Sequence, residues 1–444
     1  MATLFLIVIY LAFISLGIPD SMLGAAWPVM HGDIGAPFGS AGMLSIVASC
    51  GTIVSSLASG RLIQRIGTGW VTLVSCCLTA GALLGFAFVP TLGWLIVLCI
   101  PLGLGAGAVD SGLNHFVAAN YKAHHMSWLH CFWGVGATAG PIIMSHYITT
   151  EGSWRNGYTA VAMIQFVLVF ILFVTLPLWK KVVKLRQAER LAELGSQEPL
   201  PASATGQTGS KSVQLDAASG SAGESITVAE QSANSQPPRS DSQANQETVT
   251  SRASLFRLPG VRFTLLTFFF YCGVETTVGL WGASFLVGSR QIEPGLAAGW
   301  ISLYFAGITI GRLITGFLTL RVTNRMLILL GQLCAAIGTL LLMLPMPNVL
   351  LMTGLILIGI GLAPIFPGLL HETPARFGTD NSARLMGYQM AVAYTGITLL
   401  PPLFGLVAAY VHIGLFPFVI MAFILIMLFC SERVIRAIRQ PKIS

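Results

Sequence analysis

GTIVSSLASGRLIQR at residues 51–65 and GITIGRLITGFLTLR at residues 307–321 decide the fold of this chain, because the second stretch repeats the first after a shift of 256 residues. Two Gly, two Leu and one Arg coincide at matching positions of the two stretches. Five identities in fifteen positions are a weak signal alone, but each stretch follows a long apolar segment and ends at an Arg. The repeat therefore predicts two related halves, in which the second helix of each half ends at the same topological place.

The composition excludes a water-soluble protein. The chain is 54% hydrophobic and only 9% charged, whereas about 25% of the residues of a typical soluble domain are charged. A helix needs about 20 apolar residues to cross a bilayer, and about twelve such segments can be laid out. The predicted spans are 3–27, 40–62, 69–90, 95–119, 128–149, 157–179, 262–286, 297–319, 326–346, 350–371, 384–410 and 413–431.

The cationic residues predict how these spans are oriented. When the spans are threaded back and forth across a bilayer, every Lys and Arg except Arg155 and Arg290 falls on one side. By this count Arg312, Arg321 and Arg325 all lie on that side. An excess of Lys and Arg marks the cytoplasmic side, so the pattern predicts a multi-pass protein of the cytoplasmic membrane with both termini on the cytoplasmic side.

One polar segment divides the apolar chain. From about residue 190 to 253 the sequence is rich in Ser, Ala, Gln, Gly and Thr and almost free of aromatic residues. Such a segment cannot bury enough apolar area to offset the entropy of ordering. We therefore predict a six-helix bundle at 1–181, a largely disordered cytoplasmic linker at 182–256, and a second six-helix bundle with a short basic tail at 257–444. The fold class is an all-α polytopic membrane protein of two six-helix pseudo-repeats, which is a major facilitator architecture.

Several motifs resemble known transporters. GRLIQRIG at 60–67 resembles the loop motif between helices 2 and 3 of the major facilitator superfamily. GLGAGAVDSGLN at 103–114, LHCFWGVGATAGP at 129–141, YCGVE at 271–275 and GLAPIFP at 361–367 resemble its fucose/glucose/galactose permease branch. Members of that branch are mostly sugar–cation symporters, so the resemblance implies transport of a sugar.

Three carboxylates lie well inside the predicted spans: Asp20, Asp110 and Glu275. A charge at bilayer depth costs about 2.5–3.5 kcal/mol on insertion scales, and such residues usually face a water-filled cavity or a partner. A carboxyl group between apolar walls holds its proton more firmly and can release it when hydration changes. We therefore expect these three residues to couple transport to protons, and the resemblance, which implies acids on helices 1 and 4, favours Asp20 and Asp110. The alternative is that each carboxylate only bonds a neighbouring helix.

Polar and aromatic residues on the same helices predict where a solute binds. Amides and an imidazole can exchange hydrogen bonds with a polyhydroxylated ligand, and Trp rings can stack on the apolar face of a sugar. The candidates are Asn114, His130, Gln389, Trp27, Trp133 and Trp281. For the Trp residues the alternative is packing or interfacial anchoring, and for His130 it is a hydrogen bond between helices. A sodium-coupled protein would need converging carboxylate and carbonyl oxygens, which the sequence leaves open.

The sequence carries no enzyme signature. It has no GxxxxGK[ST], no HExxH and no GxSxG, so neither a nucleotide-driven pump nor a hydrolase is expected. The eight Cys lack metal-ligand spacing, and we expect no metal site and no cofactor. The cations are spread over loops, so we expect no nucleic-acid partner.

We therefore predict a secondary active transporter that moves a small polar solute, a monosaccharide in the first instance, by alternating access coupled to protons. Its expected partners are the solute, a proton or sodium ion and the lipid bilayer, and we expect it to function as a monomer. The alternatives are a drug or metabolite exporter of the same fold that works as a proton antiporter, and a non-transporting membrane sensor. Gly140-Pro141, in the predicted fifth helix, does not separate the exporter from the importer.

Overall fold

The computed structural model describes residues 2–121, 123–195, 256, 258–345 and 347–439, and the regular structure in these ranges is helical. The helices of the first half are α1 (Ala2–Asp33), α2 (Ser40–Ile66), α3 (Thr68–Phe88), α4 (Leu92–Asn120), α5 (Ala123–Glu151) and α6 (Trp154–Gly195). The helices of the second half are α8 (Val261–Arg290), α9 (Pro294–Leu318), α10 (Asn324–Met343), α11 (Asn348–Leu362), α12 (Ile365–Phe377), α13 (Thr379–Tyr410) and α14 (Phe416–Arg439), with a short 3₁₀ turn, η1 (Ile413–Leu415), before α14.

These helices confirm the predicted polytopic membrane fold. Within the described residues, eleven segments are long and apolar enough to cross a membrane, and α11 and α12 together form one of them, Asn348–Phe377. The helix α5 is not among the eleven, but it packs along α1 and α9, so it completes a set of twelve. The predicted span 350–371 is interrupted because α11 ends at Leu362 and α12 begins after Pro364. Proline lacks the N–H that a continuing helix requires.

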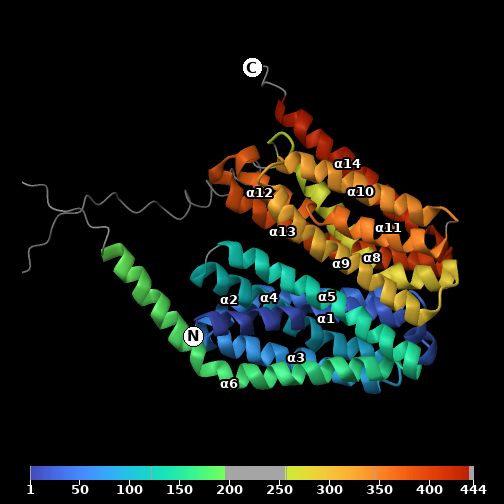
Figure 1. The fold of residues 1–444 in the computed structure, drawn as a ribbon, viewed down its shortest axis with the longest axis horizontal. Coiled ribbons are helices and arrows are strands. Elements are labelled where there is room, and N and C mark those ends of the chain that lie inside the picture. The colour runs from blue at the N-terminus through green and yellow to red at the C-terminus, as the bar shows by residue number, and fades with distance from the viewer. Residues whose placement is uncertain (1, 122, 196–255, 257, 346, 440–444) are drawn as a thin grey trace, which may run out of the picture. The chain divides into compact units, whose positions relative to one another are not determined.

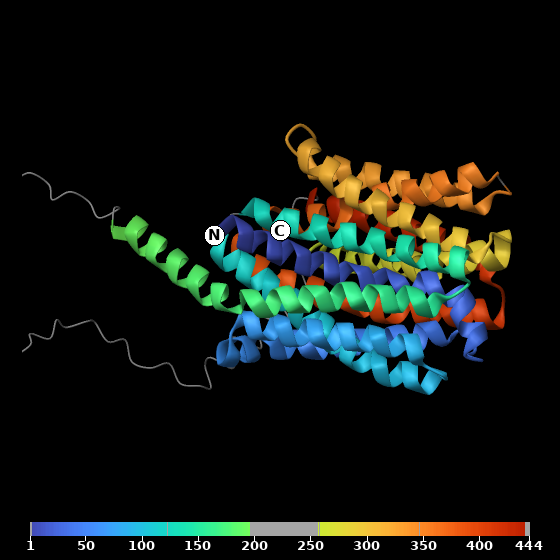
Figure 2. The same ribbon diagram turned by 60° about the horizontal axis from the view of Figure 1, so that its bottom comes forward.

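The packing of the two halves follows one scheme. In the first half α1 packs on α5, and α4 packs on both α2 and α3; in the second half α8 packs on α13, and α11 packs on both α9 and α10. The contacts between the halves are also paired, since α5 lies against α9 and α13 lies against α2. Figure 1 shows α1 to α5 (blue to green) and α8 to α14 (yellow to red) as two groups, and the turned view in Figure 2 shows their helices running roughly side by side. The structure thus confirms the pseudo-repeat.

Glycines at equivalent positions make the helix pairs close. A Cβ added to Gly103 on α4 would lie 2.1 Å from the carbonyl oxygen of Ala48 on α2. A Cβ added to Gly359 on α11 would lie 2.1 Å from the carbonyl oxygen of Tyr304 on α9. Both glycines and both partners are separated by the same 256 residues that relate the two opening stretches. Small residues permit close helix crossing in membranes, and here the same crossing recurs in each half.

The two cations outside the predicted cytoplasmic set have matching structural roles. Arg155, at the start of α6, donates from Nη1 to the carbonyl oxygens of Ala87 and Val89 at the end of α3. Arg290, at the end of α8, donates from Nη2 to the carbonyl oxygens of Leu342 and Leu344 at the end of α10. The last carbonyls of a helix have no partner within the helix and attract cations. Each arginine therefore caps the third helix of a half.

The predicted linker, 182–256, is helical in its first part, because α6 continues to Gly195. The disorder predicted for this segment falls on 196–255, which lies outside the described residues. The helices α1 to α5, α6 as far as Lys184, and α8 to α14 form one compact unit, while the rest of α6 belongs to a separate unit.

Candidate functional site

Asp20 lies near the middle of the α1 span, and an indole from another helix holds its carboxylate. The Nε1–H of Trp133, on α5, donates to Asp20 Oδ2 over 2.9 Å. The helices meet closely here, because a Cβ added to Gly17 would lie 2.0 Å from the Trp133 carbonyl oxygen. Asp20 is nevertheless exposed. An exposed acid at mid-span that is bonded by a second helix is a candidate functional residue.

A second carboxylate, Asp110 on α4, lies close enough to interact electrostatically with Asp20. Asn114, one turn further along α4, donates from Nδ2 to Asp110 Oδ1 over 2.9 Å. The Oδ1 atom of Asn114 is buried and accepts no hydrogen bond from the described residues. An amide oxygen has two lone pairs, so this atom offers an acceptor to a ligand beside the acid. Tyr394, on α13, completes the group from the second half, since it interacts electrostatically with both acids.

Glu275, on α8, is paired with a cation. Arg312 Nη2, on α9, lies 3.1 Å from Glu275 Oε1, and the two side chains are only 18% and 16% exposed. The guanidinium carbon of Arg312 also lies 5.4 Å from the centre of the Trp133 ring, and the hydroxyl of Tyr304 donates to the backbone oxygen of Glu275 over 2.9 Å. Trp133 therefore links this ion pair of the second half to Asp20 of the first half.

This position corrects one prediction and adds one residue to the site. The count of cations placed Arg312 in the cytoplasmic set, but Arg312 lies inside the span Pro294–Leu318 and not in a loop. The sequence itself indicates this position, because the predicted span 297–319 includes Arg312. A cation at that depth requires a partner, and the partner is Glu275.

His130 lies on the same side of α5 as this group. Its side chain is exposed, its ring stands edge-on to Phe13 at 6.0 Å between centres, and it interacts electrostatically with Arg312. The structure thus brings together seven predicted or newly found residues. They are Asp20, Asp110, Asn114, His130, Trp133 and the Glu275–Arg312 pair.

Trp27, on α1, and Trp281, on α8, lie elsewhere, on either side of Phe38 in the connection between α1 and α2. Both side chains are fully buried. The Nε1–H of Trp27 donates to the backbone oxygen of Phe38, and the Nε1–H of Trp281 donates to that of Pro401, each over 2.8 Å. The rings of Phe38 and Trp281 are 5.3 Å apart between centres. These residues pack near the end at which α1 finishes, outside the polar group.

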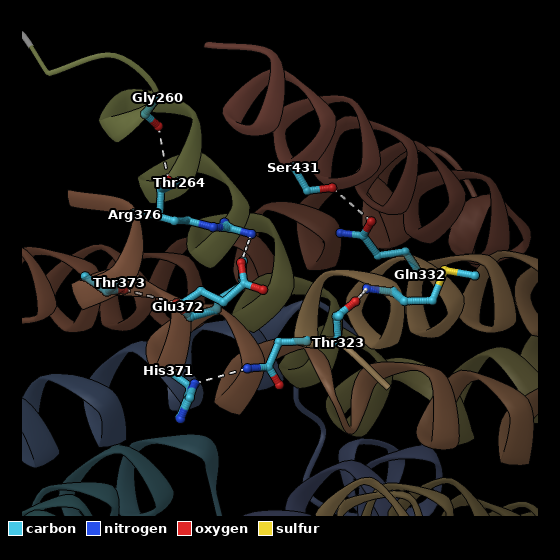
Figure 3. A network of polar contacts seen from close by, with 12 residues as sticks. Gly260, Thr264, Thr323, Gln332, His371, Glu372, Thr373, Arg376 and Ser431 are labelled. Carbon is cyan, nitrogen blue, oxygen red and sulfur yellow. Dashed lines mark hydrogen bonds and ion pairs between the residues drawn. The ribbon is translucent and has the colours of Figure 1, made fainter. Parts of the chain in front are cut away.

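Gln389 also lies outside the polar group. It is fully buried on α13, and its Nε2 donates to the hydroxyl of Thr373 on α12 over 2.9 Å. Thr373 belongs to a network at the end of the bundle where α8 begins, which Figure 3 shows with the Glu372–Arg376 ion pair, the His371 contact to Asn324 and the hydrogen bond from Ser431 to Gln332. Gln389 thus joins α13 to α12.

The chain is similar to known membrane transporters. The family model of the Major Facilitator Superfamily matches residues 9–281 and 263–439. The chain is 24% identical over 315 residues to Bypass of stop codon protein 6 of Saccharomyces cerevisiae, a match that covers 70% of this chain and 56% of that protein. It is 24% identical over 276 residues to the glucose/mannose transporter GlcP of Bacillus subtilis, which covers 62% of this chain and 56% of that protein. The chain therefore spans about half the length of the curated relatives it matches.

Solved structures share the fold. The inward-open xylose transporter XylE from E. coli superposes with a TM-score of 0.69 at 12% identity, over 100% of this chain and 98% of that chain. A D-xylose–proton symporter superposes with a TM-score of 0.68 at 13% identity, over 98% of this chain and 97% of that chain.

Proposed function

Because the chain belongs to the Major Facilitator Superfamily, we propose that it is a secondary active transporter that carries a monosaccharide across the cytoplasmic membrane together with protons. Similar proteins support the choice of solute, since one is named a glucose/mannose transporter and another a D-xylose–proton symporter. Because both proteins have low sequence identity to this chain, the proposal rests mainly on the geometry of the site and less on the names of these proteins.

The observation that carries the proposal is the pair of carboxylates at mid-span, Asp20 and Asp110. Their hydrogen-bond donors, the indole of Trp133 and the amide of Asn114, are both neutral. A carboxylate with a neutral donor and access to water can gain and lose a proton without breaking an ion pair. Glu275 differs because Arg312 already balances its charge, so we assign proton coupling to the two aspartates and the role of counter-ion to Glu275.

The neighbouring polar atoms fit a neutral solute with many hydroxyl groups. The free Oδ1 of Asn114 can accept from a hydroxyl, and the exposed ring of His130 can donate or accept. Trp133 offers an aromatic surface beside them, of the kind that packs on the apolar face of a sugar ring. We propose Asn114, His130 and Trp133 as solute-binding residues.

The packing of the two halves supports alternating access. At the end where α1 finishes, Trp27 and Trp281 are fully buried, while Asp20, two turns earlier on α1, is exposed. The structure is therefore consistent with a state that is closed at that end and hydrated at the level of the acids. Transport would require the contact between Phe38, in the connection between α1 and α2, and Trp281, on α8, to open and the opposite end to close.

The test is uptake of a panel of labelled monosaccharides into proteoliposomes with an imposed inward proton gradient. Wild type is compared with Asp110→Asn and with Asp33→Asn as a matched control. Asp33 is an acid at the end of α1 that accepts from the indole of Trp154 over 2.7 Å, so its replacement removes the same chemistry outside the site.

We expect gradient-driven uptake of one sugar that Asp110→Asn abolishes and Asp33→Asn retains. Absence of uptake for every sugar, from protein shown to be folded and inserted, would overturn sugar transport and favour a proton-driven exporter. Uptake that survives in Asp110→Asn with its full dependence on the gradient would overturn the role of that acid.

A further inference from the structure

One side chain touches an acid of the first half and a cation of the second. Trp133, on α5, donates to Asp20 through Nε1 and presents its ring to Arg312, on α9, at 5.4 Å. We propose that Trp133 is a positioning residue that transmits the protonation state of Asp20 to the Arg312–Glu275 ion pair, and thereby couples the two halves. The proposal rests on the proposed function only in taking Asp20 as a proton site.

The chemistry of the indole gives the link a direction. An indole N–H can only donate, and a hydrogen bond to an ionised carboxylate is about twice as strong as one to a neutral acceptor. Ionised Asp20 therefore holds the ring firmly, and protonated Asp20 holds it weakly. A cation interacts with a ring face within about 6 Å of its centre, and 5.4 Å is near that limit. A small rotation of the released ring removes the contact with Arg312.

The backbone around Trp133 leaves little slack. A Cβ added to Gly17 of α1 would lie 2.0 Å from the Trp133 carbonyl oxygen, and a Cβ added to Gly134 would lie 2.3 Å from the Thr309 hydroxyl of α9. The helix α5 is therefore packed tightly between α1 and α9 at this level. A shift of α5 toward α9 that follows the loss of the Asp20 bond would displace α9.

Other charged or titratable groups face the same space. Asp110 on α4 and Tyr394 on α13 interact with Asp20, and His130 interacts with Arg312. These groups tune the proton affinity of the site and the field around the ion pair. Tyr271 and Cys272 on α8 and Tyr304 on α9 also interact with Arg312. Among the described hydrogen bonds and ring contacts, Trp133 is the side chain that contacts both Asp20 and Arg312.

A second triad with the same chemistry provides a control. Trp154 donates to Asp33 over 2.7 Å, and the guanidinium carbon of Arg155 lies 4.3 Å from the Trp154 ring centre. This triad joins α1 to α6 within the first half, and Arg155 follows Trp154 directly in sequence. It should therefore transmit nothing to α9.

The test is hydrogen–deuterium exchange of the full chain in lipid nanodiscs at one fixed pH, with no solute present. Asp20→Asn mimics the protonated acid, and it is measured alone and in the Trp133→Phe background, which keeps an aromatic face but removes the N–H. We expect Asp20→Asn to change exchange in α9 at least twofold around Arg312 and to change it much less in the Trp133→Phe background. Asp33→Asn should leave α9 unchanged in either background.

An equal effect of Asp20→Asn with and without the Trp133 indole would overturn the proposal, as would no effect on α9 at all. The double variant Glu275→Gln, Arg312→Met provides a second background in case Trp133→Phe does not fold, and there too Asp20→Asn should change exchange in α9 much less than it does in wild type. The assay uses no sugar, so a failure to find a transported solute and a failure of this link are distinguished.

Discussion

Removing either partner of the Glu275–Arg312 pair is expected to destabilise the protein strongly, and removing both is expected to restore much of the loss. The two side chains are only 16% and 18% exposed and their charged atoms are 3.1 Å apart. Breaking a buried ion pair by deleting one partner costs about 3–5 kcal/mol, because the other charge is left uncompensated, whereas replacing both with apolar or neutral groups is often nearly neutral. The lost contact of Arg312 with the Trp133 ring adds up to about 2 kcal/mol when desolvated.

The assay is thermal unfolding in detergent of Glu275→Gln, Arg312→Met and the double variant. One kcal/mol shifts Tm by about 2–4 °C for 150–250 residues, and the lower end suits this longer chain. Each single variant should therefore lose about 6 °C or more, and the double variant should lose less than the sum of the two. Arg433→Met is the control, because Arg433 is exposed at the end of α14 and its guanidinium lies 5.1 Å from the Phe429 ring centre. It should lose about 2 °C or less.

Strict additivity in this cycle would refute the reasoning, because it would mean that the two side chains do not interact. A Tm loss at Arg433→Met as large as that at Arg312→Met would also refute it, since the effect would then belong to any arginine.

Three further outcomes follow from the packing. Arg155→Met and Arg290→Met each leave two carbonyls at a helix end without a donor, so each should lower Tm by about 2–6 °C, measured in the same unfolding assay, while the solute KM stays unchanged. Gly103→Ala places a Cβ 2.1 Å from a backbone oxygen and should cost about 1–3 kcal/mol, whereas Gly60→Ala, which meets nothing within 4 Å, should be neutral or stabilising; chemical unfolding of both variants checks the contrast. Trp281→Phe removes a buried hydrogen bond and should lower Tm with KM within twofold of wild type, and a tenfold rise in KM in uptake assays would instead return Trp281 to the solute site.

The sequence alone predicted the architecture because membrane physics constrains it strongly. Twelve apolar segments and a repeat at 256 residues leave few arrangements, and the paired contacts of Gly103 and Gly359 confirm the shift at atomic scale. The break before Pro364 was not predicted, because a single Pro inside an apolar run is compatible with a kinked helix as well as with two helices.

The sequence did not separate the candidates that lie in the polar group from those that lie elsewhere, because a span fixes the depth of a residue and not the direction in which it points. Asp20 and Trp27 are separated by two turns of α1 and were both site candidates, yet one is exposed beside Trp133 and the other is fully buried. Gln389 is likewise turned toward Thr373. Helix rotation is set by packing against neighbours, which one sequence does not reveal. Arg312 was missed for a different reason. When every cation was assigned to one side of the membrane, this residue was counted with the cytoplasmic loops although it lies within a span.

The charges at mid-span indicate why protons would control the transport cycle. Glu275 and Arg312 balance each other, so the uncompensated charge in this group is carried by Asp20 and Asp110. Each ionised carboxylate costs about 2.5–3.5 kcal/mol when it loses its access to water inside the membrane, so closing both ends of the site around two ionised acids would cost about 5–7 kcal/mol. A cost of this size lowers the population of the occluded state by about four to five factors of ten. In the proposed mechanism, protons remove this barrier and the solute fills the space that water leaves, so neither crosses efficiently without the other.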